Sequence, residues 1–428
     1  GINKGGTSGG AIPAILINTP GTAVNALTTY DGYPMTRAGE ARRALSLAYS
    51  ASFFGGIFSV VCLVLLSQVL AAIAPMFGSR EIFLAALLGV VLVVISHRGQ
   101  SVIAAFLVSM GIFLNTIGLE PVRYSQRFTF EQTWLTSGID LIVVVLGLFA
   151  LSQAFLLLLE RDHSPEAPPV EGGLFQGLGE LRRYPRVVTT SSAFGVVMGI
   201  IPGVGEFLAQ FFSYTLAMKT SKTPERFGNG APEGLIASEA ANNAVPAAAM
   251  IPLLALGIPG EALTAMMLSV FYVHNVVPGP QLFQDQADFV VGLYLALFIL
   301  NILVLAFLMV STNGILRLIR VPTRFLGVAI LTLGFVGVYS LRNSATDCAV
   351  AAGFGVFGFV LRRLELPVVP IILGMVLGGI MEAKLRISMA RVKTPLDFID
   401  RPVAAIIFAI IVLAIGLHVW SLLRARRG

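Results

Sequence analysis

Long apolar segments alternate with short polar ones along most of the chain. Apolar runs that reach the roughly 20 residues needed to cross a bilayer lie at 44–73, 139–160, 187–218, 289–312 and 402–423. Shorter runs lie at 82–96, 101–117, 323–340, 345–363 and 366–381. Because no charged stripe divides these runs, the pattern predicts an all-α polytopic membrane protein with about ten transmembrane helices.

Composition excludes most soluble classes. Of the 428 residues, 56% are hydrophobic and 12% are charged, about half the charged fraction of a soluble domain. A large soluble enzyme would need charged helix faces, and the sequence lacks them. The net charge of +6 comes from short basic clusters between apolar runs, which is typical of topology signals in a lipid bilayer. We therefore expect no nucleic-acid partner.

A motif rich in proline and glycine occurs twice. The segments are GGTSGGAIPAILINTPG at 5–21 and AAMIPLLALGIPG at 248–260. When residues 9–27 are shifted by 239 positions onto 248–266, the pairs Ile12/Ile251, Pro13/Pro252, Pro20/Pro259, Gly21/Gly260, Ala23/Ala262 and Ala26/Ala265 are identical. The sequence therefore predicts an internal repeat.

The least apolar connection, 161–186, divides the chain. We predict a first membrane repeat at 1–160, a cytoplasmic linker at 161–186 and a second membrane repeat at 187–428. The motif IPGVG at 201–205 would have its counterpart near position −38. We therefore expect an N-terminal segment of at least about 40 residues to precede this sequence.

Loop charges predict that the second repeat is inverted. Arg37, Arg42 and Arg43 follow the first motif, whereas Asp285 and Asp288 follow the second, which places the first loop in the cytoplasm and the second outside. When the predicted spans are followed along the chain, two basic stretches, 219–228 and 384–393, are placed on the outer side of the membrane, against the positive-inside rule. Either one span is re-entrant or the number of predicted spans is wrong by one.

The repeated breaks have a physical consequence in lipid. Unpaired backbone groups survive there only where protein or a water-filled cavity satisfies them, so the two motifs should form re-entrant or discontinuous helices. Helix ends exposed in this way bind carboxylates, and in inverted-repeat transporters they hold the substrate near the midplane. The alternative is that proline and glycine serve only as kinks and close-packing points.

Few charged side chains lie near these breaks. Glu206, Glu239 and Glu261, with the hydroxyl of Ser8, are candidates for coupling to an ion, because an acid within the membrane is a functional hypothesis by default. Each acid could carry H⁺, bind Na⁺ or pair with a basic residue, and an interfacial or structural role is the alternative. We expect no other metal and no cofactor.

An enzyme is not expected. The stretch GTSGG is similar to the nucleophile context of some serine hydrolases, but a triad needs a histidine base and an orienting acid. His97, His163, His274 and His418 lie mostly in loops or at membrane edges. The G-x-x-x-G at Gly195–Gly199 predicts close helix packing.

Several long motifs together carry a family resemblance. GGAIPAILINTPGTAVNALTTYDGYPM, GIIPGVG, PEGLIASEAANNAVPAAAMIPLLALGIPG and VVPGPQLF resemble the large membrane subunit of the tripartite tricarboxylate transporters. The family's first helix, with its own Pro-Gly break, is absent from this sequence. With the motif reasoning above, the resemblance gives these substrate-binding candidates: Gly9, Gly10, Asn18, Thr19, Pro20, Gly21, Thr22, Asn242, Asn243, Gly257, Ile258, Pro259 and Gly260.

The resemblance implies a multi-pass transporter of the bacterial inner membrane. It implies cation-driven uptake of citrate and related di- and tricarboxylates, with a small membrane subunit and a periplasmic substrate-binding protein as partners. The absence of a Walker A motif agrees with secondary transport. A passive organic-anion channel is the alternative function, since the helix-end argument applies to it equally.

Overall fold

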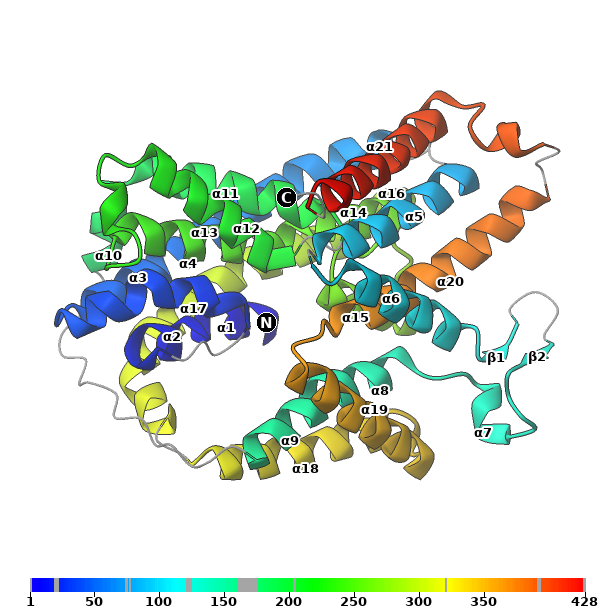
Figure 1. The fold of residues 1–428 in the computed structure, drawn as a ribbon, viewed down its shortest axis with the longest axis horizontal. Coiled ribbons are helices and arrows are strands. Elements are labelled where there is room, and N and C mark those ends of the chain that lie inside the picture. Colours follow the sequence, from blue (N-terminus) through cyan, green and yellow to red (C-terminus); the bar gives the residue numbers. More distant parts are fainter. Residues whose placement is uncertain are drawn as a thin grey trace. The chain divides into compact units, whose positions relative to one another are not determined.

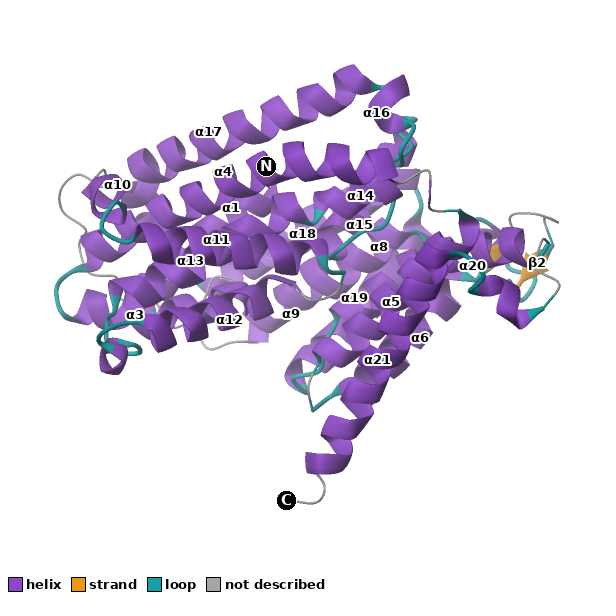
Figure 2. Cartoon of the chain, turned by 90° about the horizontal axis from the view of Figure 1, so that it is seen from above, coloured by secondary structure: helices purple, strands orange, loops and turns teal. Residues whose placement is uncertain are grey.

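The computed structural model describes residues 2–18, 23–73, 76, 78–97, 99–120, 125–159, 176–202, 205–319, 322–390 and 394–425. Helices dominate these ranges, as Figure 2 shows. The described strands are β1 (Gly118–Leu119) and β2 (Gln126–Arg127), which pair as a short antiparallel hairpin. The all-α prediction is confirmed.

The chain forms two compact units, each assembled from three segments. Unit 1 contains Gly1–Ala72, Ser164–Gly260 and Val276–Val321, and unit 2 contains Ile73–His163, Glu261–Asn275 and Pro322–Gly428. Each unit therefore draws on both predicted sequence repeats. The division into repeats at 1–160 and 187–428 is a statement about sequence symmetry and stays a prediction.

Thirteen described elements belong to unit 1 (Figure 1). They are α1 (Ile2–Gly9), α2 (Ala11–Ile17), η1 (Ala23–Asn25), α3 (Ala26–Arg37), α4 (Ala41–Ile73), α10 (Gln176–Leu181), α11 (Pro185–Ile200), α12 (Gly205–Thr220), η4 (Pro224–Arg226), α13 (Pro232–Ala248), α14 (Met250–Leu256), α16 (Leu282–Asp285) and α17 (Ala287–Ile319).

Unit 2 contains the β1–β2 hairpin and a second set of helices. They are α5 (Ser79–Ser96), α6 (Ser101–Asn115), α7 (Thr133–Thr136), α8 (Leu141–Val145), the π-helical turn η3 (Leu146–Leu151), α9 (Ser152–Leu159), α15 (Ala262–Val273), α18 (Thr323–Arg342), α19 (Ala345–Arg363), α20 (Val369–Met389), η5 (Pro395–Phe398) and α21 (Pro402–Ala425). Since α8, η3 and α9 follow without a gap, they form one helical rod.

Seven helices in the described ranges are long and apolar enough to cross a membrane. They are Ala41–Ile73, Ser79–Ser96, Leu141–Leu159, Ala287–Thr312, Arg324–Arg342, Ala345–Arg363 and Pro402–Trp420. Each coincides with a predicted run, which supports a multi-pass membrane protein. The other three runs differ: α6 is short, α20 carries charged residues in its last turns, and 187–218 is not one helix.

The run at 187–218 is broken into the two helices α11 and α12. Val187, at the start of α11, packs against the apolar cluster that includes Tyr214 and Ala217, near the end of α12. The two helices therefore form a hairpin whose outer ends lie together. The break follows from IPGVG, where Pro202 cannot continue the helix and Gly205 adopts a positive φ of 72°.

This hairpin explains why the basic loop at 219–228 did not fit the membrane orientation predicted from loop charges. The carboxylate of Asp31, in α3, accepts hydrogen bonds from the backbone N–H groups of Gly228, Gly230 and Ala231. The loop after α12 therefore lies against the second half of α3, where Gly230 also approaches Pro34 and Met35. Because α11 and α12 return to the side from which they start, both basic loops occupy one end of unit 1.

Glycine allows the helices of unit 1 to approach closely. A methyl group added at Gly195 would meet the Ala241 carbonyl of α13, and one at Gly199 would meet the Val245 carbonyl. This confirms the packing role predicted for the G-x-x-x-G motif. In Figure 1 α11, α12 and α13 accordingly lie side by side.

Small residues and ion pairs organise unit 2 in the same way. Gly111 of α6 and Gly374 of α20 each face a backbone carbonyl of the other helix. Beyond the apolar part of α20, Glu382 pairs with Arg127 of β2, with 2.7 Å between Arg127 Nη1 and Glu382 Oε1. This ion pair fastens the β1–β2 hairpin to the end of α20. Within the basic stretch 384–393, Arg386 pairs with Glu120 and Glu382.

The two Pro-Gly motifs share one backbone conformation. α2 and α14 are both seven residues long, and a shift of 239 superimposes their bounds. The preceding residues, Gly10 and Ala249, have φ/ψ of −64°/−20° and −64°/−18°. Both helices end in a left-handed residue, Asn18 at φ 55° and Gly257 at φ 70°. The structure therefore supports the internal repeat at the level of the backbone.

Candidate functional site

A network of buried polar side chains in unit 1 joins α1, where the first motif begins, to α13, the helix that precedes the second motif. At its centre is Asn243 of α13, which is 1% exposed. Its Oδ1 accepts a hydrogen bond from Lys4 Nζ at 2.9 Å and one from Ser8 Oγ at 2.8 Å, both from α1. Lys4 and Asn243 are themselves related by the 239-residue shift, so the repeats meet at equivalent positions.

The carboxylate of Glu239 lies one turn before Asn243 on the same face of α13. Its Oε1 accepts from Thr28 Oγ1 at 2.6 Å, and its Oε2 accepts from Ser52 Oγ at 2.8 Å. Asn243 Nδ2 contacts the same Oε2 at 3.3 Å. A fully buried carboxylate needs such donors, because leaving an ionised group unpaired in a low dielectric costs several kcal/mol.

Asn243 therefore bridges two buried charges of opposite sign. Lys4 Nζ also donates to the Ser52 carbonyl at 3.0 Å. Through Asn243, the amino group of Lys4 and the carboxyl group of Glu239 are held one amide apart. Glu206 of α12 also interacts electrostatically with Lys4.

Close helix packing positions these side chains. The absence of a side chain at Gly55 of α4 lets that helix approach the Ala240 carbonyl of α13. At Gly56 the space is filled by Asn301 Oδ1 of α17 and by Lys4 Nζ. Glycine at these two positions therefore makes room for the polar network, and any larger residue would displace it.

Sequence reasoning missed Lys4, which is 8% exposed. The available signal was a single lysine in the glycine-rich, otherwise uncharged opening of the chain, GINKGGTSGG. An intramembrane cation is costly and is kept for a function. It also missed Asn25, Thr28, Ser52 and Gln210, because serine, threonine and single amides are common on packed membrane helices.

The predicted residues of the first motif are only partly described. Ser8, Gly9 and Gly10 lie at the end of α1 and in the turn before α2, and Asn18 caps α2. Asn25 Nδ2 donates to the Thr7 carbonyl at 3.1 Å. Thr19, Pro20, Gly21 and Thr22 lie outside the described residues.

The predicted residues of the second motif form a buried turn. Gly257 takes the left-handed conformation that ends α14, and the Ile258 N–H reaches back to the Pro252 carbonyl at 3.3 Å. Pro259 and Gly260 are buried as well. Pro252, like Pro13, lies in the first turn of its helix, where the missing N–H leaves no hydrogen bond unmade.

The two predicted amides have different surroundings, although they are adjacent in sequence. Asn243 has all of its polar atoms engaged in the network. The Nδ2 and Oδ1 of Asn242 have no hydrogen-bond partner, and its side chain is 0% exposed. Of the ion-coupling candidates, Ser8 and Glu239 belong to the network and Glu206 lies near it, whereas Glu261 belongs to unit 2.

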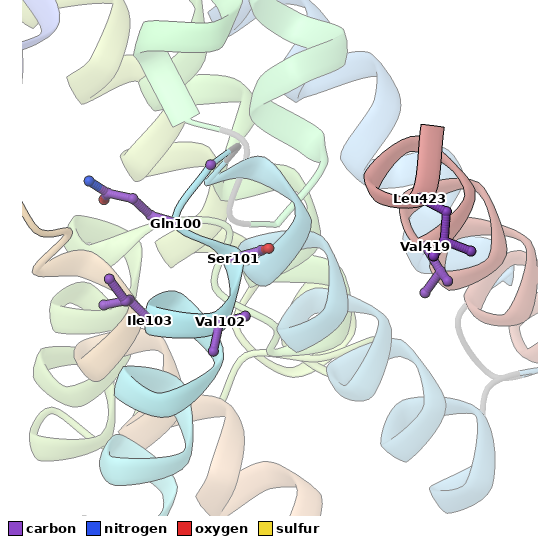
Figure 3. Close-up of a pocket in the computed structure, with 7 residues that line it drawn as sticks. Gln100, Ser101, Val102, Ile103, Val419 and Leu423 are labelled. Carbon is purple, nitrogen blue, oxygen red and sulfur yellow. The ribbon is translucent and has the colours of Figure 1, made fainter. Parts of the chain in front are cut away.

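A groove on the surface of unit 2 differs from the buried network because its lining is mostly apolar. This groove of about 390 Å³ is lined by Gly99 and Gln100 of the α5–α6 turn, by Ser101–Ile103 at the start of α6, and by Val419 and Leu423 of α21. Figure 3 shows the side chain of Gln100 pointing away from α21, and its Nε2 donates to the Glu365 carbonyl. The groove is largely apolar and its lining holds no charged residue, so it is suited to lipid rather than to a carboxylate.

The buried network is chemically mixed. It combines one buried ammonium, one buried carboxylate and several hydroxyl and amide groups within packed helices. No cluster of three or more histidine, cysteine or acidic side chains suited to a metal occurs among the described residues. Amide and hydroxyl donors with a lysine fit carboxylate groups.

Comparison with known proteins also indicates a protein that handles carboxylates. A family model described as "Tripartite tricarboxylate transporter TctA family" matches residues 1–373. An uncharacterized 52.8 kDa protein in the TAR-I ttuC' 3' region of Agrobacterium vitis is 32% identical over 428 residues, which cover all of this chain and 85% of that protein. A second protein of the same organism, in the TAR-II ttuC' 3' region, is 32% identical over 234 residues, or 54% of this chain and 97% of that protein. No solved structure matches.

Proposed function

Because the chain belongs to the TctA family of tripartite tricarboxylate transporters, we propose that it imports citrate-like di- and tricarboxylates across the bacterial inner membrane. Uptake is secondary and cation-driven. A periplasmic binding protein delivers the substrate, and a small membrane subunit completes the complex. The observation that carries this proposal is the buried Lys4–Asn243–Glu239 network, where the helices that lead into the two repeated motifs meet.

We propose that the two repeats are inverted about an axis through this network. Contacts between equivalent residues support that arrangement, since Lys4 bonds its counterpart Asn243. The 33-residue helices α4 and α17 also run antiparallel, because Tyr49 near the start of α4 bonds Thr312 near the end of α17. An inverted repeat lets one site face the two sides of the membrane alternately.

The electrical cost of import requires a coupling ion. Moving a polyvalent anion into a negative-inside cell costs about 2.3 kcal/mol per charge per 100 mV. More than one Na⁺ or H⁺ must therefore accompany each substrate. Glu239 is the candidate to accept that positive charge, because its carboxylate is the acid most deeply embedded in the network.

The basic end of unit 1 supports a cytoplasmic orientation. Arg37, Arg43, Arg183, Lys219 and Lys222 lie in or beside the loops gathered there. The positive-inside rule places such an end in the cytoplasm. The opposite loop, with Asp285 and Asp288, then faces the periplasm, where substrate arrives.

The test is uptake of labelled citrate into vesicles that carry the complete three-component system. We expect uptake that depends on a Na⁺ or H⁺ gradient, needs the binding protein, and disappears in Lys4→Met. The exposed-loop variant Asn229→Ala serves as the control. Passive flux that follows the citrate gradient alone would instead identify an organic-anion channel.

A further inference from the structure

Two amide side chains of unit 1 keep buried polar atoms without a partner. Asn242 makes no hydrogen bond with either end of its amide. Gln210 of α12, also 0% exposed, donates from Nε2 to the Val24 carbonyl, but its Oε1 accepts from no group. Leaving such atoms unpaired lowers the stability of a fold, so each requires a reason.

Helix geometry brings these two amides to the same side of a helix pair. Ala209 of α12 packs against Ala241 of α13, and Ser213 Oγ, one turn later, donates to the Ala237 carbonyl, one turn earlier, so the helices are antiparallel. In an antiparallel pair of right-handed helices, the residues that follow two contacting residues both turn to the same side. Gln210 and Asn242 are those residues.

The side to which they turn is bordered by η1 (Ala23–Asn25). Gln210 is bonded to Val24 in η1, the short helix that follows the NTPGT segment. Asn242 lies on α13 between the face that meets α12 and the face that carries Glu239. The two amides therefore border the same region of unit 1 as the buried charge network.

The unused atoms define what a ligand must offer. Asn242 presents two N–H donors and one carbonyl oxygen, and Gln210 presents a second carbonyl oxygen. A carboxylate can only accept hydrogen bonds; it satisfies the N–H groups but would face two carbonyl oxygens with no proton between them. A ligand with an O–H group beside its carboxylate satisfies both kinds of atom.

We propose that Gln210 and Asn242 determine substrate specificity by binding the hydroxyl group of a hydroxycarboxylate. This inference rests on the proposed carboxylate transport and names the class of substrate. Asn242 donates to the carboxylate, while the amide carbonyls of both residues share the single hydroxyl proton in a three-centre hydrogen bond. Hydroxyl-free analogues of equal charge are then disfavoured because they leave buried acceptors unpaired.

The experiment measures binding to the purified full chain in lipid nanodiscs, so that the selectivity of a binding protein plays no part. Two matched pairs serve as ligands: citrate against propane-1,2,3-tricarboxylate, and malate against succinate. Within each pair the charge is the same and only the hydroxyl differs. We expect the hydroxyl-bearing member to bind about tenfold tighter or more.

Two variants separate specificity from folding. Asn242→Leu removes donors and acceptor without breaking any hydrogen bond, so we expect an unchanged or raised melting temperature and loss of binding to both pairs. Gln210→Leu should keep the hydroxyl-free ligands bound and reduce the preference within each pair to about threefold or less. Asn229→Ala, an exposed loop change, should leave both preferences as they are.

Each other outcome overturns the inference in a distinguishable way. Equal binding within the pairs by the wild type would mean that water satisfies the amides, and carboxylate transport itself would stand. A lowered melting temperature in Asn242→Leu with the preference intact would assign Asn242 to the fold. If the chain binds none of the ligands while vesicles take up citrate, another part of the transport system recognises the hydroxyl group. If uptake of citrate also fails, the proposed carboxylate transport is contradicted as well.

Discussion

The phenol oxygen of Tyr49 lies 3.1 Å from the hydroxyl oxygen of Thr312. The same arrangement recurs in reverse, because Tyr294 bonds Ser67. A shift of 245 residues converts Tyr49 into Tyr294 and Ser67 into Thr312. Each of the two long helices therefore places a tyrosine near its start against a hydroxyl near the end of the other, which is the reciprocity expected of a two-fold relationship.

The two tyrosine bonds should contribute equally to stability. Tyr49→Phe and Tyr294→Phe each remove one buried hydrogen bond, so we expect each to lower the free energy of unfolding by about 1 kcal/mol. The two sites lie about 27 Å apart along α4, and the effects should add in the double variant. Thermal unfolding followed by dye labelling of the free, partly buried Cys62 and Cys348 measures them. A double variant that is no less stable than either single variant would contradict two independent hydrogen bonds.

Removing Asn243 should destabilise the fold, in contrast to removing Asn242. Asn243→Leu leaves Glu239 and Lys4 buried without their bridge, and we expect a loss of about 3 kcal/mol. The same melting measurement, run beside Asn242→Leu, provides the comparison. Equal melting temperatures for the two variants would show that the network contributes no net stability.

The Lys4 and Glu239 charges should depend on each other. Lys4→Met alone strands a buried carboxylate, whereas the double variant Lys4→Met/Glu239→Gln restores neutrality. We expect the single variant to lose about 3 kcal/mol and the double variant to recover more than half of that loss. Citrate uptake should remain absent from both. Recovery of uptake in the double variant would remove Glu239 from the coupling mechanism.

The contact between α11 and α13 at Gly195 should not tolerate any larger side chain at this position. A methyl group there would meet the Ala241 carbonyl and the Ala244 side chain, so Gly195→Val should cost about 2–3 kcal/mol. Gly353, in α19, has open space around it. Gly353→Ala should therefore be neutral or stabilising by about 0.5–1 kcal/mol. Similar melting temperatures for the two variants would contradict the packing of α11 on α13.

Acid should loosen the β1–β2 hairpin. The hydrogen bond from Arg127 holds the pKa of Glu382 below its usual range. Because the folded pKa is depressed, the pair stabilises the hairpin above the ordinary pKa of 4.5 and loses this effect as pH falls through the lower folded value. Limited proteolysis of 118–138 in nanodiscs should thus accelerate below about pH 4.5.

The matched variant for that measurement is Glu382→Gln. It should be cleaved faster than the wild type at pH 7 and show little further acceleration in acid. Cleavage of the wild type at one rate from pH 7 to pH 3 would mean that the ion pair does not hold the hairpin.

The sequence by itself determined the helical membrane class, because hydropathy over 20 residues is a local property that needs no partner. It also determined the repeated motif, since proline at positions 13 and 252 and a glycine or asparagine at the left-handed ends act within one helical turn. The backbone of α2 and α14 follows from those residues alone.

Only the tertiary structure decided which polar groups meet. Lys4 and Asn243 are 239 positions apart, and nothing local indicates that they bond. Asn242 and Asn243 are neighbours in sequence, yet one helical step of 100° gives one a complete set of partners and leaves the other with none. The run at 187–218 reads as one span by hydropathy; the IPGVG motif breaks it locally, and packing of both halves on α13 holds them together as a hairpin. Pairing of distant helices, rather than local preference, built the site.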